Sequence, residues 1–330
     1  MKEKRTSLED IAKKVGVSKA TVSFVLNDKG DEFNISKEKQ RIIRETAKEM
    51  SYVPNFFAKS LRQGETKTIG VVVSDISNPF YAELSKSIQQ ELYKKGYNVF
   101  LVNTNEDKEL EMTLMRELIQ RSIDGMIISP SNSIEPLIPI LRETHIPVVF
   151  ADRPGDENAD FVGVDNFLEA KKLVTMFRRK PKKMAILVKK NHQTVTFDER
   201  IKGASEACKE SNIAFELVNL SMEQSKADVT IKSLMEAGVD TFLALNNLVA
   251  LKTLAGLKNN KISIPEQAQL ISFDDSEAFP YINPPISALS QPIQKMGEDT
   301  VERLMARLKE SENPGKHLML PCQFIERGSH

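Results

Sequence analysis

From Ile69 onward, short apolar runs alternate with segments whose apolar residues recur every three or four positions. Helical stripes such as Leu84, Ile88 and Leu92 separate the runs. The apolar runs are typical of strands and occupy residues 69–73, 97–102, 124–129, 146–151, 161–164, 184–188, 214–218, 241–245 and 268–273. Near-continuous apolar strands separated by helices predict parallel sheets covered on both faces. Because the pattern restarts after a loop, we expect two α/β lobes whose strand carboxyl ends share a cleft.

The first 68 residues differ from this α/β body in charge. They contain 15 Lys and Arg against 10 Asp and Glu, a net charge of +5. The rest of the chain contains 31 against 36, a net charge of −5. A small basic segment joined to a larger acidic body is an asymmetry that needs a functional explanation.

Composition excludes several other classes of protein. No apolar run approaches the roughly 18 residues of a membrane span, and the first ten residues lack the apolar core of a signal peptide. Cys208 and Cys322 are too few for a disulfide framework, and the four His residues show no metal-ligand spacing. We therefore expect a reduced cytoplasmic protein with no metal, no cofactor and no membrane partner.

The basic segment contains the pattern of a helix-turn-helix. Ser7 and Asp10 resemble a capping box, Gly16 ends the helix that they open, and further helices begin near Ser18 and Ser36. This spacing alone fits DNA binding and any other small three-helix module equally well. The outward residues of the second helix favour DNA, because hydroxyl and Lys groups reach phosphates or base edges while Ala and Phe contact thymine methyl groups. These outward residues are Lys19, Ala20, Thr21, Ser23 and Phe24.

Two longer motifs resemble those of one family. TSLEDIAKKVGVSKATVSFVLN at 6–27 and SYVPNFFAKSLRQGETKTIGVVVSDISNPFY at 51–81 resemble the lactose-repressor (LacI/GalR) family of bacterial transcription regulators. The resemblance resumes with FDD at 273–275 and LSQPIQKMGEDTVERLM at 289–305, so it covers essentially the full length. It implies an all-α helix-turn-helix head and an α/β body, a two-lobed periplasmic-binding-protein-like (type I) fold with parallel sheets.

The resemblance also implies domain boundaries. The helix-turn-helix DNA-binding domain would span residues 1–54, and a hinge helix with its linker would span 55–68. The chain would then cross three times between the lobes of the body. The N-terminal effector-binding lobe would comprise 69–157 and 289–313, and the C-terminal lobe 158–288 and 314–330.

For the head, the resemblance places DNA contacts on the recognition helix and on the hinge. Phe24 departs from the family pattern, in which Arg or His is usual, so a typical family operator is not expected. Leu61 matches the leucine that wedges between central base pairs, although it could instead pack on the body. The residues expected to bind DNA are Ser18, Lys19, Ala20, Thr21, Ser23, Phe24, Asn27, Asn55, Lys59, Leu61 and Arg62.

For the body, the resemblance implies an effector site made of polar side chains that follow the predicted strands. The residues expected to bind the effector are Asn78, Phe80, Tyr81, Asp152, Arg200, Asn246, Asp274 and Gln291. Arg200 could instead be a solvated surface charge, Asp152 could belong to a surface turn, and Asp274 could cap the next segment. Asn247 competes with Asn246 for the ligand and cap roles. Lys189, Lys190 and His192 could face the cleft and favour a phosphorylated or acidic ligand.

The resemblance implies a sequence-specific transcription regulator, most simply a repressor. It would bind a pseudo-palindromic double-stranded DNA operator as a homodimer, in the bacterial cytoplasm and at the nucleoid. A small-molecule effector, a sugar or sugar derivative, would control it. The alternatives are a cytoplasmic solute-binding protein without operator specificity and an α/β enzyme. The basic head counts against the first, and the lack of GxSxG, GxxxxGK and GxGxxG motifs counts against the second.

Overall fold

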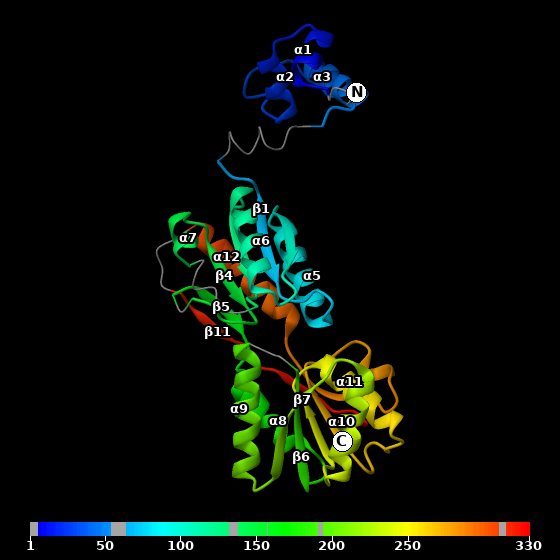
Figure 1. Cartoon of the computed structure of the whole chain (residues 1–330). Coiled ribbons are helices and arrows are strands. Elements are labelled where there is room, and N and C mark those ends of the chain that lie inside the picture. The colour runs from blue at the N-terminus through cyan, green and yellow to red at the C-terminus, as the bar shows by residue number, and fades with distance from the viewer. Residues whose placement is uncertain (1–5, 54–63, 132–137, 157, 191–193, 310–314) are drawn as a thin grey trace. The chain divides into compact units, whose positions relative to one another are not determined.

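The computed structural model describes residues 6–53, 64–131, 138–156, 158–190, 194–309 and 315–330. The chain divides into two compact units, Met1–Thr66 and Lys67–His330, named the head and the body below (Figure 1). Within the described ranges, no helix has the length and apolar character needed to cross a membrane.

The described part of the head, residues 6–53 and 64–66, contains the helices α1 (Leu8–Val15), α2 (Lys19–Leu26) and α3 (Lys37–Glu49). The predicted capping box is present, because the Ser7 hydroxyl accepts a hydrogen bond from the Asp10 amide and the Asp10 carboxylate accepts one from the Ser7 amide. Gly16 ends α1 with a φ of 75°, which a residue without a Cβ adopts easily. The small apolar core of the head consists of Ile11, Ala12, Val22, Val25, Ile43 and Ala47.

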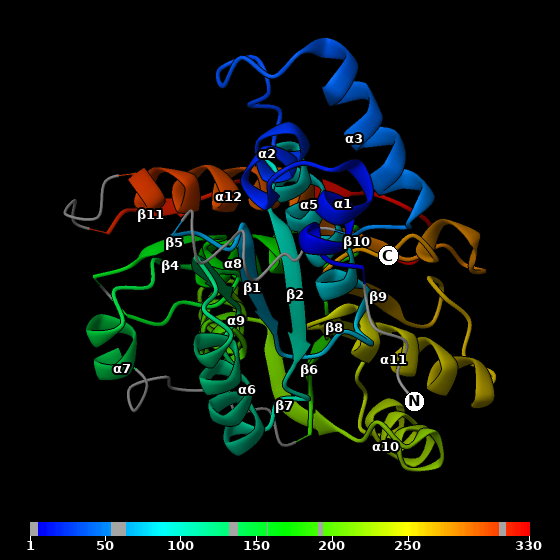
Figure 2. The same ribbon diagram turned by 90° about the horizontal axis from the view of Figure 1, so that it is seen from above.

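The first lobe of the body contains a six-stranded sheet in the order β11-β5-β4-β3-β1-β2, in which all pairs are parallel. Its strands are β1 (Thr68–Val73), β2 (Asn98–Asn103), β3 (Gly125–Ile128), β4 (Val148–Ala151), β5 (Asp160–Gly163) and β11 (His317–Met319). Apolar clusters on both faces join the sheet to its helices. Helices α5 (Pro79–Lys94) and α12 (Ile293–Lys309) cover one face, and α6 (Lys108–Gln120) and α7 (Ile138–Glu143) cover the other (Figure 2).

The second lobe repeats this plan with the strand order β12-β10-β9-β8-β6-β7. Its strands are β6 (Lys183–Lys189), β7 (Ala214–Leu220), β8 (Thr241–Ala244), β9 (Gln269–Phe273), β10 (Ser287–Ser290) and β12 (Gln323–Ile325), of which only β12 is antiparallel to its neighbour. Helices α8 (Asn166–Leu173) and α9 (Val195–Glu210) pack on one face, and α10 (Gln224–Glu236) and α11 (Asn247–Asn259) on the other. Short 3₁₀ helices follow at η2 (Val174–Met176) and η3 (Phe279–Tyr281).

The strand pairings differ from the expected lobe boundaries. Strand β5 pairs with β4 and β11, so the first sheet extends past residue 157 and includes 317–319, which had been expected in the second lobe. Strand β10 pairs with β9, so residues 289 and 290 belong to the second sheet and not to the first. These expectations were wrong because a short apolar strand can join either sheet, and its membership depends on tertiary pairing.

Candidate DNA-reading face and effector cleft

Helix α2 of the head is buried on one side and accessible on the other. Val22 and Val25 are fully buried, and Ser18 caps the helix by accepting a hydrogen bond from the Thr21 amide at 3.1 Å. The residues expected to bind DNA are exposed at Ser18, Lys19 and Ala20 and half-buried at Thr21, Ser23, Phe24 and Asn27. This arrangement leaves a mostly polar face of α2 available to a major groove.

Phe24 has an aromatic partner that sequence reasoning missed. Its ring stacks on that of Phe33, with centroids 3.6 Å apart and planes 9° apart. Phe33 is half exposed and lies in the segment between α2 and α3. Gln40 orders this segment by donating from Nε2 to Asp31 Oδ1 and to the Ile35 carbonyl, both at 2.8 Å. No periodic or capping signal marks Phe33, so its position could not be read from the sequence.

The predicted hinge contacts cannot be placed in the same way. Asn55, Lys59, Leu61 and Arg62 lie outside the described residues.

Seven of the eight residues expected to bind the effector line one cavity of the body. They come from both lobes and follow or flank the carboxyl ends of strands, where α/β sheets bind ligands. The seven are Asn78, Phe80, Tyr81, Asp152, Arg200, Asn246 and Asp274. The eighth, Gln291, donates from Nε2 to Asp274 Oδ1 at 2.6 Å and lines a neighbouring cavity.

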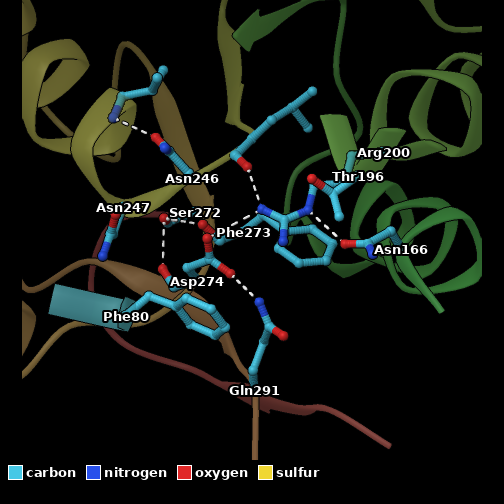
Figure 3. Close-up of polar contacts among 12 residues, drawn as sticks. Phe80, Asn166, Thr196, Arg200, Asn246, Asn247, Ser272, Phe273, Asp274 and Gln291 are labelled. Carbon is cyan, nitrogen blue, oxygen red and sulfur yellow. Dashed lines mark hydrogen bonds and ion pairs between the residues drawn. The ribbon is translucent and has the colours of Figure 1, made fainter. Parts of the chain in front are cut away.

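Arg200 is the most heavily engaged side chain of this cleft (Figure 3). Its Nε donates to Asn166 Oδ1 at 2.8 Å, and its Nη1 donates to the Leu245 carbonyl at 2.8 Å and to Asp274 Oδ2 at 3.1 Å. The guanidinium carbon lies 3.7 Å from the centroid of the Phe273 ring. With only 4% of its surface exposed, Arg200 is not a solvated surface charge.

Asp152 and Tyr81 form a buried polar pair on the first lobe. The Tyr81 hydroxyl donates to Asp152 Oδ2 at 2.8 Å. Burial raises the pKa of the Asp152 carboxyl, although the Arg153 and Arg200 guanidinium groups act in the opposite direction. Burial also raises the pKa of the Tyr81 hydroxyl, which therefore remains a hydrogen-bond donor at neutral pH.

Three Asn side chains lie at the cleft, where helices α5 and α11 begin. Asn246 caps α11 by accepting from the Val249 amide at 2.8 Å, and Asn78 caps α5 by accepting from the Phe80 amide at 3.1 Å. Asn247 donates from Nδ2 to Asn78 Oδ1 at 3.1 Å and so links the two lobes. The cap role therefore falls to Asn246, whereas Asn247 makes an inter-lobe contact.

The same cavity is lined by seven residues that were not in the expected site, and most give no signal of their own in the sequence. These are Asp75, Glu106, Arg153, Lys189, Thr196, Phe197 and Leu248. Of the three basic residues that could face the cleft, Lys189 lines the cavity, Lys190 is exposed, and His192 lies outside the described residues. Arg153 stands beside Asp152 in a segment that reads as a polar turn, yet only 6% of its surface is exposed.

The cavity is small because its side chains pair with one another. It encloses about 30 Å³, whereas pockets for drug-sized ligands usually enclose about 300–1,000 Å³. Binding of a sugar-sized molecule therefore requires the lobes to separate or the paired side chains to change partners.

Comparisons with known families match both units of the chain. Residues 7–55 match the family described as "Bacterial regulatory proteins, lacI family", and residues 176–330 match "Periplasmic binding protein-like domain". The HTH-type transcriptional repressor PurR of Aliivibrio fischeri (strain MJ11) is 28% identical over 98% of each chain. The HTH-type transcriptional regulator RegA of Clostridium saccharobutylicum is 29% identical over 98% of this chain and 99% of its own.

Solved structures give the same result for the fold. A LacI-family transcriptional regulator from Enterococcus faecalis V583 with bound ribose has a TM-score of 0.70 and 28% identity, covering 79% of this chain and 98% of that one. A lac repressor dimer bound to operator and an anti-inducer has a TM-score of 0.84 over 99% of both chains, at 19% identity, which bears on the fold alone. The chain therefore combines a DNA-binding domain that matches the lacI family of bacterial regulatory proteins with a periplasmic-binding-protein-like domain, and this combination places it among the DNA-binding transcription regulators and not among enzymes.

Proposed function

We propose that this chain represses transcription by binding a pseudo-palindromic operator as a homodimer, under the control of a sugar or sugar derivative bound in the cleft. The main support is the convergence of seven expected effector residues, from both lobes, on one cavity. A related regulator that is 28% identical was solved with bound ribose, which supports a sugar-like effector. A regulator of this kind would act in the cytoplasm and at the nucleoid.

In this proposal the segments of the chain have separate tasks. Residues 1–54 would read DNA through α2, and the hinge expected at 55–68, whose last residue begins strand β1 of the body, would contact the minor groove. The first lobe, expected at 69–157 and 289–313, is extended by the strand pairings to include β5 and β11. The second lobe, expected at 158–288 and 314–330, would supply Arg200, Asn246 and Asp274 to the effector.

Effector control would follow from the hydrogen bonds and ion pairs that the cleft side chains make with one another. A ligand that replaces the contact between Arg200 and Asp274 favours a different arrangement of the two lobes, because the free cavity is too small to admit it otherwise. If the two lobe arrangements differ in operator affinity, the ligand changes that affinity by the ratio of its own affinities for the two arrangements.

Selection of genomic fragments by the purified full chain, at a stated salt concentration, tests this function. We expect recovery of a short pseudo-palindrome, protected over both half-sites in a footprint. Replacing Lys19 by Ala should weaken operator binding by about tenfold or more, since a good base contact contributes about 1–3 kcal/mol. Lys48→Ala on the exposed side of α3 removes the same charge and is the matched control.

Binding that stays indifferent to sequence, with and without added bacterial metabolites, would contradict the proposal. Equal losses for Lys19→Ala and Lys48→Ala would show that the basic head acts only through its overall charge.

A further inference from the structure

Two cations from opposite lobes share one carboxylate in the effector cleft. Arg153, which follows β4 of the first lobe, donates from Nη2 to Glu106 Oε1 at 3.2 Å. Lys189, at the end of β6 in the second lobe, donates from Nζ to Glu106 Oε2 at 3.2 Å. Each carboxylate oxygen thus receives one cationic donor, and the three side chains line the same cavity as Arg200 and Asp274.

We propose that the effector carries a carboxylate or phosphate group, and that Arg153 and Lys189 bind this anion at the position that the Glu106 carboxylate occupies. The inference rests on the proposed function and specifies its effector as an acidic sugar derivative, such as a sugar acid or a sugar phosphate. A guanidinium and an ammonium that approach two oxygens of one group from different sides suit either anion.

Arg153 has a remaining donor that such an anion would satisfy. Its side chain is 7% exposed, and its Nη1 donates to the Pro130 carbonyl at 3.1 Å. Its Nε–H is buried and has no hydrogen-bond acceptor among the described residues, with Asp152 Oδ2 at 3.7 Å. A buried donor of this kind favours a ligand that brings a further oxygen, because an unsatisfied polar group is costly in the interior.

Glu106 is the side chain that an anion can displace from Arg153 and Lys189. Its side chain is 27% exposed, about four times the fraction for Arg153, and it lies on the segment after β2 and not within a strand. Water reaches the Lys189–Glu106 pair, whose side chains are 33% and 27% exposed, and such pairs contribute little net stability, so an incoming anion has a weak competitor to displace there. The Arg200, Asp274 and Asn246 side chains across the cavity remain for the hydroxyl groups of the same ligand.

Native mass spectrometry identifies the effector without assuming its structure. The purified full chain is incubated with a deproteinised bacterial metabolite extract that has been separated on an anion exchanger. We expect a bound ligand only from the retained, anionic fractions. The identified compound and its neutral counterpart, for example ribose 5-phosphate and ribose, are then compared by titration calorimetry, and the anionic member should bind at least about tenfold more tightly.

Two neighbouring lysines provide a matched pair of variants. Lys189→Gln should weaken binding of the anionic ligand about tenfold or more, whereas Lys190→Gln, which removes the same charge from an exposed side chain, should leave it unchanged. Glu106→Gln should strengthen binding, because it removes the competing carboxylate and keeps the side-chain shape.

The outcomes distinguish this inference from the proposed function. A neutral ligand whose affinity is the same in the Lys189→Gln variant would overturn the anionic site and leave effector control intact. Weaker binding in Glu106→Gln would overturn it as well, by showing that the carboxylate itself holds the ligand. If no fraction yields a ligand, both the anionic site and effector control fail.

Discussion

At the residue scale, one buried guanidinium organises the second-lobe half of the cleft. Arg200 satisfies an amide oxygen, a backbone carbonyl and a carboxylate at once, from three different segments of the lobe. The planar fork of Arg reaches these acceptors in fixed directions, whereas the ammonium of Lys is a compact charge on a flexible stem. The identity of this side chain, and not only its charge, therefore holds the site together.

The Arg200→Lys substitution should lower the free energy of unfolding by about 2 kcal/mol, because at least one buried acceptor loses its donor. Arg200→Ala should cost about 3–5 kcal/mol, since it leaves Asp274 as an uncompensated buried charge. Urea unfolding measures both changes in free energy, from the midpoint and slope of the transition of the body. Lys202→Ala, on the exposed face of the same helix, should change stability by less than about 0.5 kcal/mol. Wild-type stability in the Arg200→Lys protein would contradict this account.

The residues of the cleft differ in how far the sequence could predict them. Arg200, Asp274 and Asn246 follow or open recognisable segments, so resemblance and strand position together pointed to them. Glu106 and Arg153 could not be found in this way, because each lies in a polar segment that reads as a turn. Their role depends on the meeting of two lobes, which no local pattern describes.

At the element scale, a single glycine sets the distance between the two helices that carry Arg200 and its partner. Gly203 lies in α9, three residues after Arg200, and a Cβ at this position would approach the Phe167 carbonyl oxygen of α8 to 2.0 Å. The close packing brings Asn166 at the start of α8 within 2.8 Å of Arg200. Arg200 in the cleft and Gly203 at the α8–α9 contact thus lie one turn apart on the same helix.

Gly203→Ala should destabilise the body by about 1–3 kcal/mol, because α8 and α9 must move apart. This reverses the usual trend, in which Ala stabilises a helix by about 1 kcal/mol relative to Gly. The variant should also weaken effector binding, as Arg200 loses its Asn166 contact. Gly256→Ala in α11 is the comparison, since the nearest atoms to its Cβ would be in the Ile231 side chain, at 2.9 Å, and not in the backbone of a neighbouring helix, so a smaller loss of stability is expected. Thermal unfolding compares the two, and equal effects would argue against a special α8–α9 contact.

The strands show why the position of a strand in the sequence is easier to predict than the strand with which it pairs. The apolar run at 69–73 predicts its strand because a central strand is buried on both faces, and β1 is buried throughout. Strands β10 and β11 have four and three residues and include Ser or His, so they resemble loops. Their sheet membership follows from pairing with β9 and β5, which lie 14 or more residues away.

At the scale of the whole molecule, the head and the body have cores of very different size. Among the described residues, the head encloses one cluster with six buried members, Ile11 to Ala47, whereas the body has four larger clusters that cover both faces of its two sheets. Small cores stabilise a domain only marginally, since the buried fraction of the surface grows with chain length. The two units should therefore differ in stability, and a ligand that binds one unit should raise the unfolding temperature of that unit.

Calorimetry of the full chain should accordingly show two unfolding transitions, with the smaller one, from the head, at the lower temperature. A fragment of residues 67–330 should retain only the upper transition. Added operator duplex should raise the lower transition by mass action, and this shift should shrink as salt increases, because phosphate contacts release counterions. A cleft ligand should raise the upper transition in the full chain and in the fragment alike. One transition that moves as a whole with either ligand would instead mean that the head and body unfold as a single cooperative unit.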